Sequence, residues 1–147
     1  MKLSLIKLKQ VHTFWYITEN YFGNGFFAIK KNYGELPYTK EELQKANIEL
    51  RDVTEERIES IMPNANHNGY VKYEGTLELK TSFKSGEFAK SKQLLFIGDI
   101  MINDLFFEII SFFLKQGNMY EIYIKDDNSA VLFVSAPYTC ICMPTKN

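Results

Sequence analysis

The sequence predicts an α+β fold: a mostly antiparallel sheet packed by an amphipathic helix. Three observations support it. Residues 94–144 read as a strand, a helix and three further strands in succession. The helix, at 104–116, has an apolar face so wide that a sheet or a second helix must cover it. Residues 13–30 are rich in strand-forming side chains and contain a glycine turn. A chain of 147 residues fits one domain, and we expect a single domain with a helical insertion at 35–69.

The expected helix has recognisable ends. Asn103 is suited to the N-cap, Asp104 lies where the helix dipole favours a negative charge, and Gly117 provides a C-terminal stop. Its polar stripe is narrow and consists of Asp104, Glu108, Ser111 and Lys115. Exposing each large apolar side chain of the opposite face would cost roughly 1.5–3 kcal/mol. We therefore expect Ile109, Phe112 and Phe113 to be buried.

The first thirty residues predict strands joined by turns. Lys2–Lys9 alternates apolar and polar side chains, which favours a strand. Thr13–Thr18 and Phe26–Lys30 are further strand candidates on either side of a turn at Gly23–Gly25, so we expect a hairpin or meander. Trp15 is assigned to the core because clustered aromatic residues usually pack together.

The insertion is expected to be helical and acidic. Thr39 and Glu42 form a capping box that begins a short helix through Lys45, and a second helix is expected over Thr54–Met62. The segment Glu35–Ile61 carries four basic and eight acidic side chains, a net charge of −4. We interpret it as a solvated pair of helices, with an acidic docking surface as the alternative.

The segments that flank the expected helix on both sides also have readable patterns. Tyr70–Leu79 alternates apolar and polar residues and predicts a strand or strand pair, and Thr81–Lys92 reads as a loop. Asp126–Ser129 joins two strands and predicts a hairpin turn.

No motif in the sequence identifies a reaction centre. His12 and His67 are far apart and lie in unlike contexts. Cys140 and Cys142 alternate in an apolar run, as side chains on the buried face of one strand would, so we expect neither a disulfide nor a metal site. No cofactor is expected. These observations favour a binding or regulatory role over a catalytic one.

Two other classes of function stay open at this point. The first is a small enzyme whose residues come from distant positions, such as His67 with Glu74 or Asp99. The second is a structural protein that assembles with itself through the wide apolar helix face. A pocket lined by convergent polar groups would favour the enzyme, and a flat apolar patch would favour binding or assembly.

Charge and hydropathy bear on partners and location. The net charge of −1 gives no general reason to expect nucleic-acid binding, but Lys84, Lys90 and Lys92 are candidate phosphate contacts. No apolar run approaches the ~20 residues that span a bilayer, and residues 1–11 lack the apolar core of a signal peptide. We expect a cytoplasmic protein without a membrane partner.

The C-terminal half resembles the last half-domain of the bacterial replicative sliding clamp. In that family a strand is followed by an amphipathic helix and three strands, and the chain closes on Met-Pro. The matching stretches here are Ile102–Phe107, Tyr120–Ile124, Ala130–Ser135 and Tyr138–Pro144. A clamp domain consists of two such half-units, and Phe14–Asn20 with Phe26–Lys30 is similar to the paired strands of a first one.

The resemblance implies clamp-like βαβββ half-units and a role as an accessory of DNA replication in a bacterium or phage. In clamps the C-terminal Met-Pro region helps to form a hydrophobic pocket for partner peptides. The resemblance therefore implies that Met143 and Pro144 contact a protein partner. Packing alone gives another role, in which Met143 closes the core and Pro144 ends the strand.

Overall fold

The computed structural model describes residues 5–11, 13–61, 69–82, 92–115 and 119–145. The helices are α1 (Leu5–Lys9), α2 (Lys40–Lys45), α3 (Glu55–Ile61) and α4 (Asp104–Leu114). The first strands are β1 (Trp15–Ile17), β2 (Tyr21–Asn24), β3 (Phe27–Lys31), β4 (Val71–Tyr73) and β5 (Leu77–Ser82). The later strands are β6 (Lys92–Ile97), β7 (Ile100–Asn103), β8 (Tyr120–Ile124), β9 (Val131–Ser135) and β10 (Tyr138–Cys142). The expected α+β class is confirmed.

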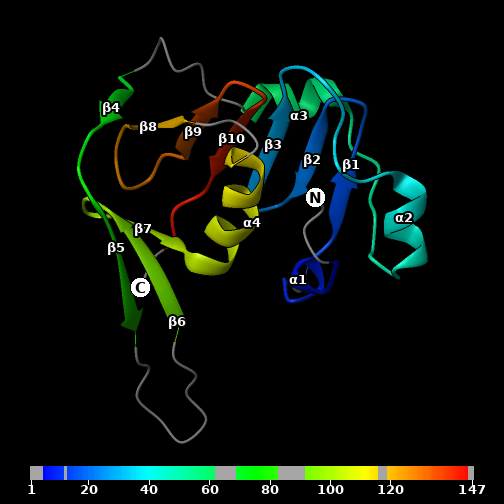
Figure 1. The fold of residues 1–147 in the computed structure, drawn as a ribbon, viewed down its shortest axis with the longest axis horizontal. Coiled ribbons are helices and arrows are strands. Elements are labelled where there is room, and N and C mark those ends of the chain that lie inside the picture. The colour runs from blue at the N-terminus through cyan, green and yellow to red at the C-terminus, as the bar shows by residue number, and fades with distance from the viewer. Residues whose placement is uncertain (1–4, 12, 62–68, 83–91, 116–118, 146–147) are drawn as a thin grey trace, which may run out of the picture.

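Within the described residues the strands form two antiparallel sheets (Figure 1). The larger sheet has seven strands in the order β1-β2-β3-β10-β9-β8-β4, and the smaller has three in the order β5-β6-β7. At the centre of the larger sheet β3 pairs with β10, with Ile29 opposite Cys140. The sheet therefore contains two runs of consecutive strands, β1-β2-β3 and β8-β9-β10, that meet at their third members.

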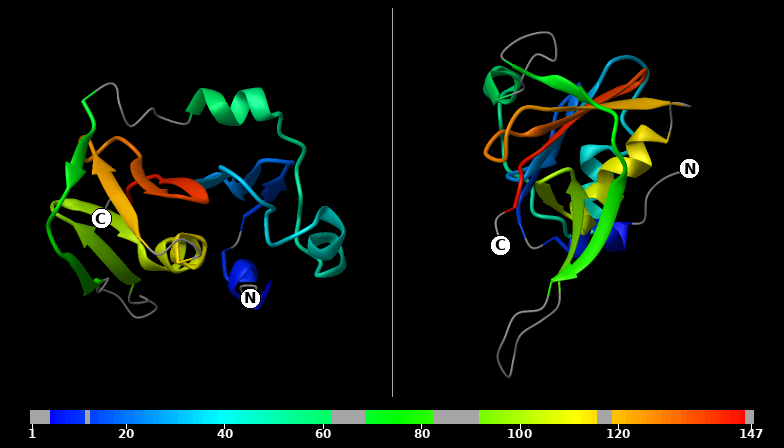
Figure 2. Two further views of the ribbon diagram at one scale, coloured as in Figure 1. Left: turned by 45° about the horizontal axis from the view of Figure 1, so that its top comes forward. Right: turned by 90° about the vertical axis from the view of Figure 1, so that its left-hand side faces the viewer.

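A helix precedes each of these two runs. Helix α1 comes before β1 and helix α4 comes before β8, and both lie on the same side of the larger sheet (Figure 2). The Lys7 ammonium of α1 lies 2.8 Å from a carboxylate oxygen of Glu108 in α4, so the two helices are in contact. The chain thus contains two helix–strand–strand–strand segments with mirrored strand order.

Helix α4 packs against both sheets, and its N-terminus is the one that the sequence predicts. The Asn103 side-chain oxygen accepts a hydrogen bond of 2.8 Å from the Leu105 amide. Ile109 and Phe113 are fully buried, as expected, whereas Phe112 is only half-buried. Gly117, the expected C-terminal stop, lies outside the described residues. The helix joins the two sheets through one core because its apolar face is wide enough to contact both.

Helix α3 covers the opposite face of the larger sheet (Figure 2). Ile58 is buried in a second cluster with Tyr16, Tyr21 and Ile141. Carboxylates on α3 hold it in place. The Glu55 side chain accepts hydrogen bonds from the Thr18 hydroxyl at 2.8 Å and from the Asn20 amide at 3.1 Å.

The strand expected at Lys2–Lys9 is wrong, because Leu5–Lys9 is helix α1. Over so few residues an alternating pattern also fits a helix, since Leu5 and Leu8 are three apart. Leu8 is fully buried in the main core and Leu5 packs against it. The tertiary structure therefore decides this element.

The meander of the first strands is confirmed, with its turn displaced. Gly23 and Asn24 belong to β2, and the turn lies at Gly25–Phe26. Gly23 lies opposite both Tyr16 and Ala28, where an added Cβ would collide with the Phe27 carbonyl oxygen. Glycine is needed at this position because the backbone of β3 approaches β2 closely, and not because the chain turns here.

Several remaining expectations are confirmed in modified form. The Thr39 hydroxyl caps α2 by accepting from the Glu42 amide at 3.2 Å. The strand pair expected in Tyr70–Leu79 exists, but β4 and β5 belong to different sheets. The run before α4 is a hairpin of β6 and β7 instead of one strand, because Gly98 reverses the chain with a φ of +63°.

The expected turn after β8 is confirmed by its hydrogen bonds. The Asp126 carboxylate accepts a hydrogen bond of 2.9 Å from the Asn128 amide, which closes the chain reversal between β8 and β9.

Candidate functional site

Met143 and Pro144 lie directly after β10, the central strand of the larger sheet. The Met143 amide donates a hydrogen bond of 2.9 Å to the Phe26 carbonyl, and the Thr145 amide donates one of 2.8 Å to the Met101 carbonyl. This segment therefore joins the β2–β3 turn to strand β7. Pro144 is half-buried.

An apolar surface forms where these segments meet. Phe26 and Met143 are each 44% exposed. The Phe26 ring stacks on the ring of Phe106 from α4, with 5.0 Å between centroids. We call the surface made by Phe26, Met101, Phe106, Met143 and Pro144 the Phe26–Met143 surface. Of these residues the sequence alone indicates only Met143 and Pro144, because the pairing of Phe26 with them depends on the β3–β10 register.

Of the other site candidates from the sequence, Lys92, Glu74 and Asp99 are among the described residues. Lys84, Lys90 and His67 lie outside the described residues. Lys92 begins β6 opposite Ser82. Glu74 and Asp99 are both exposed, in the β4–β5 and β6–β7 connections.

Cys140 and Cys142 are fully buried free thiols in β10, as their alternation predicts. Burial raises the pKa of both thiols, and a protonated buried thiol is neither a nucleophile nor a metal ligand. Within the described ranges no group of three or more His, Cys, Asp or Glu side chains could hold a metal ion.

A pocket of about 410 Å³ lies between the start of β1, the β2–β3 turn and helix α3. It is lined by Phe14, Tyr16, Asn24, Gly25, Arg51, Asp52, Val53, Arg57, Ile58 and Ile61, and we call it the α3 pocket. Arg51 and Arg57 are the only two arginines in the sequence. The Arg51 guanidinium lies over the Phe14 ring, 4.3 Å from its centroid, and its Nε is 3.7 Å from a Glu49 carboxylate oxygen.

Two residues that line the α3 pocket each contain a buried polar atom without a partner. The Tyr16 hydroxyl and the Asn24 side-chain nitrogen have no hydrogen-bond partner in the part of the chain that the structure describes. The Asn24 oxygen accepts from the amides of Phe26 at 2.7 Å and Phe27 at 3.0 Å. Asn24 lies opposite Trp15 in the strand register, so its side chain is on the main-core face of the sheet, and only the Tyr16 hydroxyl is on the face of α3. Burial raises the pKa of Tyr16 to about 12, so this hydroxyl remains a donor at neutral pH.

The acidic side chains of α3 that point toward the sheet are engaged. Burial raises the pKa of Glu55, but hydrogen bonds from Thr18 and Asn20 together hold it below its usual value. The Tyr21 hydroxyl donates to the Glu59 carboxylate at 3.0 Å. These contacts fix α3 on the sheet and thereby position Arg57 and Ile58 along the α3 pocket.

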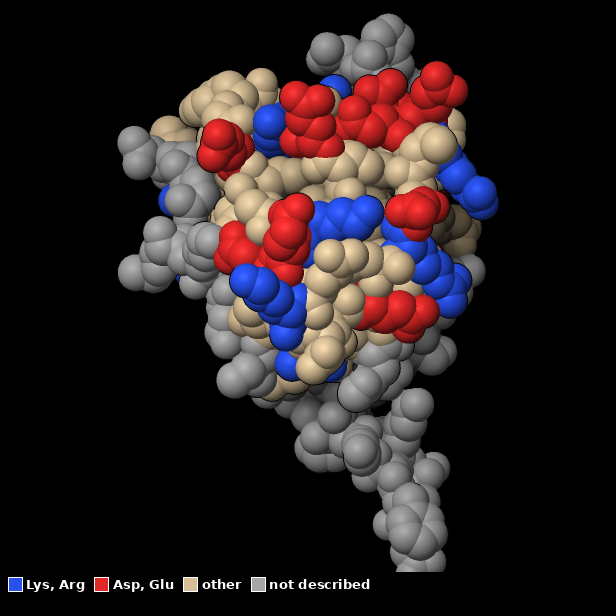
Figure 3. Space-filling view, turned by 90° about the vertical axis from the view of Figure 1, so that its right-hand side faces the viewer, with Lys and Arg blue, Asp and Glu red and all other residues tan. Residues whose placement is uncertain are grey.

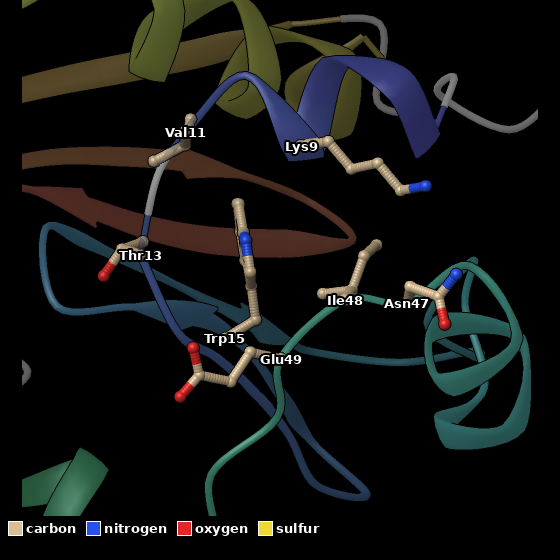
Figure 4. Close-up of a pocket in the computed structure, with 7 residues that line it drawn as sticks. All are labelled: Lys9, Val11, Thr13, Trp15, Asn47, Ile48 and Glu49. Atoms are coloured by element: carbon tan, nitrogen blue, oxygen red, sulfur yellow. The ribbon is translucent and has the colours of Figure 1, made fainter.

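A second hollow of about 360 Å³ lies between α1, β1 and the segment after α2 (Figure 4). Lys9 and Glu49 give its wall charges of opposite sign, and Trp15 forms its floor. Trp15 is 1% exposed and stacks on Phe22 with 5.1 Å between centroids, which confirms its assignment to the core. None of the described residues that line it has a buried, unpaired hydrogen-bond donor or acceptor. The hollow therefore gives no indication of a ligand.

The face that carries α2 and the edge of β1 is mixed in charge (Figure 3). Acidic side chains gather along its upper rim, at the level of α3, and basic side chains lie between and below them. The net acidity of the Glu35–Ile61 segment is therefore interrupted by cations and does not form a continuous acidic field.

Searches against protein-family models, curated proteins and solved structures find no match to this chain. None of the helices in the described ranges is long and apolar enough to cross a membrane.

Proposed function

We propose that this chain is a non-catalytic binding protein of bacterial or phage origin that docks a short apolar segment of a partner protein on the Phe26–Met143 surface. One observation carries the proposal. Two large apolar side chains from opposite ends of the sequence, Phe26 and Met143, are adjacent and each 44% exposed. Their backbones are hydrogen-bonded and one ring is braced by Phe106, so the surface is preorganised.

The size of this surface favours a short segment as its occupant. A stable interface between two folded proteins buries about 800 Å² on each partner, far more than two partly exposed side chains supply. A few apolar anchors suffice for a peptide, because a small number of residues carries most of the binding free energy. Methionine suits this role because its unbranched thioether adapts to varied partners.

The resemblance to sliding clamps makes the proposal more specific. A clamp domain consists of two half-units, and this chain has two helix–strand–strand–strand segments whose third strands pair. We therefore propose a clamp-like accessory of DNA replication. The polar stripe of α4 carries Asp104 and Glu108, which favours a protein partner over a DNA duplex as the ligand of this side.

We also place the protein in the cytoplasm. Cys140 and Cys142 are free and buried in the same strand, a state that a reducing compartment preserves.

Peptide binding tests the proposal. Fluorescence anisotropy would measure the affinity of a short labelled peptide in which Leu and Phe alternate with Ser. Met143→Ala and Phe26→Ala should each weaken binding about tenfold, the effect of losing an apolar anchor worth about 1.4 kcal/mol. Leu79→Ala is the matched control, because it truncates a side chain that is 54% exposed in the smaller sheet.

Three outcomes would overturn this assignment. The first is equal weakening by Leu79→Ala, which would mean that the peptide binds exposed apolar groups without selection. The second is a concentration-dependent dimer that Met143→Ala abolishes in sedimentation, which would assign the surface to self-association. The third is salt-sensitive binding of duplex DNA that is lost when Lys84, Lys90 and Lys92 become Gln, without any peptide binding.

A further inference from the structure

Both arginines of the chain line the α3 pocket. The sequence has 17 basic side chains in all, and only Arg51 and Arg57 are arginines. They come from different segments, the extended stretch after the β-bridge of Leu50 and helix α3. Arginine differs from lysine in presenting a planar fork of donors that matches phosphate and carboxylate groups.

The buried end of the same pocket offers a further donor. The Tyr16 hydroxyl is protonated at neutral pH and has no hydrogen-bond partner among the described residues. Tyr16 is 4% exposed, so its hydroxyl is not satisfied by bulk water. An unpaired buried polar group destabilises a fold, and one at the end of a pocket indicates a ligand group that supplies an acceptor.

The remaining wall is apolar. Phe14, Val53 and Ile58 line it, and Ile61 lies exposed at its rim. The volume of about 410 Å³ falls within the range of pockets for small ligands, about 300–1,000 Å³. Of the carboxylates near the arginines, Asp52 lines the pocket and Glu49 lies beside Arg51, while Glu55 and Glu59 bind side chains of the sheet.

We propose that the α3 pocket binds a small organic anion whose phosphate or carboxylate group meets Arg51, Arg57 and Tyr16 while its apolar body contacts Phe14 and Ile58. This site is separate from the Phe26–Met143 surface. Phe26 stacks on α4, on one side of the larger sheet, whereas Ile58 and Tyr16 belong to the cluster on the other side. The proposal therefore stands whether or not the surface binds a peptide.

Isothermal titration calorimetry with phenyl phosphate and with benzoate tests the proposal and distinguishes the two anions. Inorganic phosphate lacks the apolar body, and benzyl alcohol lacks the charge, so both should bind at least about tenfold more weakly. Arg57→Gln should weaken the anion about 10- to 100-fold, as expected for a hydrogen bond to a charged group. Lys80→Gln, in the smaller sheet, is the control for loss of one positive charge.

Two tyrosine variants separate binding from folding. Tyr16→Phe removes an unpaired hydroxyl, so it should leave the melting temperature unchanged or raise it while weakening the anion about tenfold. Tyr21→Phe removes a hydroxyl that donates to Glu59, so it should lower the melting temperature and leave the affinity unchanged. A purely structural role for Tyr16 cannot produce this opposite pattern.

The proposal is overturned if neither phenyl phosphate nor benzoate binds, if inorganic phosphate binds as tightly as phenyl phosphate, or if Arg57→Gln and Lys80→Gln have equal effects.

Discussion

Lys7 and Glu108 form an ion pair of 2.8 Å that joins helix α1 to helix α4 across 101 positions of sequence. Their side chains are 34% and 46% exposed, and such pairs contribute about 0.2–1 kcal/mol. We therefore expect Lys7→Gln to lower the free energy of unfolding by less than about 1 kcal/mol in urea titrations. A double-mutant cycle with Glu108→Gln would isolate the pair, and a coupling above about 2 kcal/mol would contradict this assignment.

Burial of Leu8 should hold α1 in place far more strongly than this ion pair does. The Leu8 side chain is fully buried in the main core, one residue from Lys7. Leu8→Ala should cost about 2–5 kcal/mol, the range for a buried leucine. Urea denaturation of the two single variants gives the comparison, and equal losses from both would show that α1 is not held by its apolar side.

Phe113 and Phe112 give a second matched pair, on helix α4. Phe113 is fully buried and contacts Tyr138 with 5.2 Å between ring centroids, whereas its neighbour Phe112 is half-buried. Phe113→Ala should cost about 3–5 kcal/mol and Phe112→Ala clearly less. Chemical denaturation checks this order. The reverse order would mean that the face of α4 with Phe112, and not the face with Phe113, lies in the core.

Stability should fall at alkaline pH because of the buried thiols. Burial raises the pKa of Cys140 and Cys142 above the ordinary value of 9.0, so they stay protonated in the folded state while the unfolded chain ionises. The contribution of the protonated thiols to the free energy of unfolding is therefore complete below about pH 8.5. It is lost as the pH rises, at about 1.4 kcal/mol per pH unit for each thiol. The double variant Cys140→Ala, Cys142→Ala should show a shallower decline between about pH 9 and 10.

The measurement is the free energy of unfolding of both proteins across this pH range. Tyr16 also has a raised pKa, but from an ordinary value of 10.0, so its effect begins at higher pH. Identical slopes for the two proteins between pH 9 and 10 would show that the thiols are not buried.

Glu55 should contribute to stability with the opposite pH dependence. Its pKa is lowered by hydrogen bonds from Thr18 and Asn20, so its contribution is present at neutral pH and lost as the pH falls through its titration range. Glu55→Gln should cost about 1–2 kcal/mol at pH 7 and less under acidic conditions. Glu56→Gln, an exposed change on the same helix, is the control, and equal effects of both would contradict the role of Glu55.

Local patterns in the sequence determined much of this architecture. The cap at Asn103 and the apolar period after it specify helix α4, and the Thr39 capping box specifies the start of α2. Both depend on contacts between residues a few positions apart, which the chain can form in isolation. The burial of Cys140 and Cys142 likewise follows from alternation along one strand.

Tertiary structure alone decided α1 and the composition of both sites. The apolar pattern of Leu5–Lys9 fits a strand and a helix equally, so burial of Leu8 selects between them. The contact of Phe26 with Met143 requires the register of β3 against β10. Arg51 and Arg57 share one pocket because Glu55 fixes α3 on the sheet. Long-range contacts of this kind leave no local pattern, since the residues that meet are distant along the chain and each has an ordinary sequence environment.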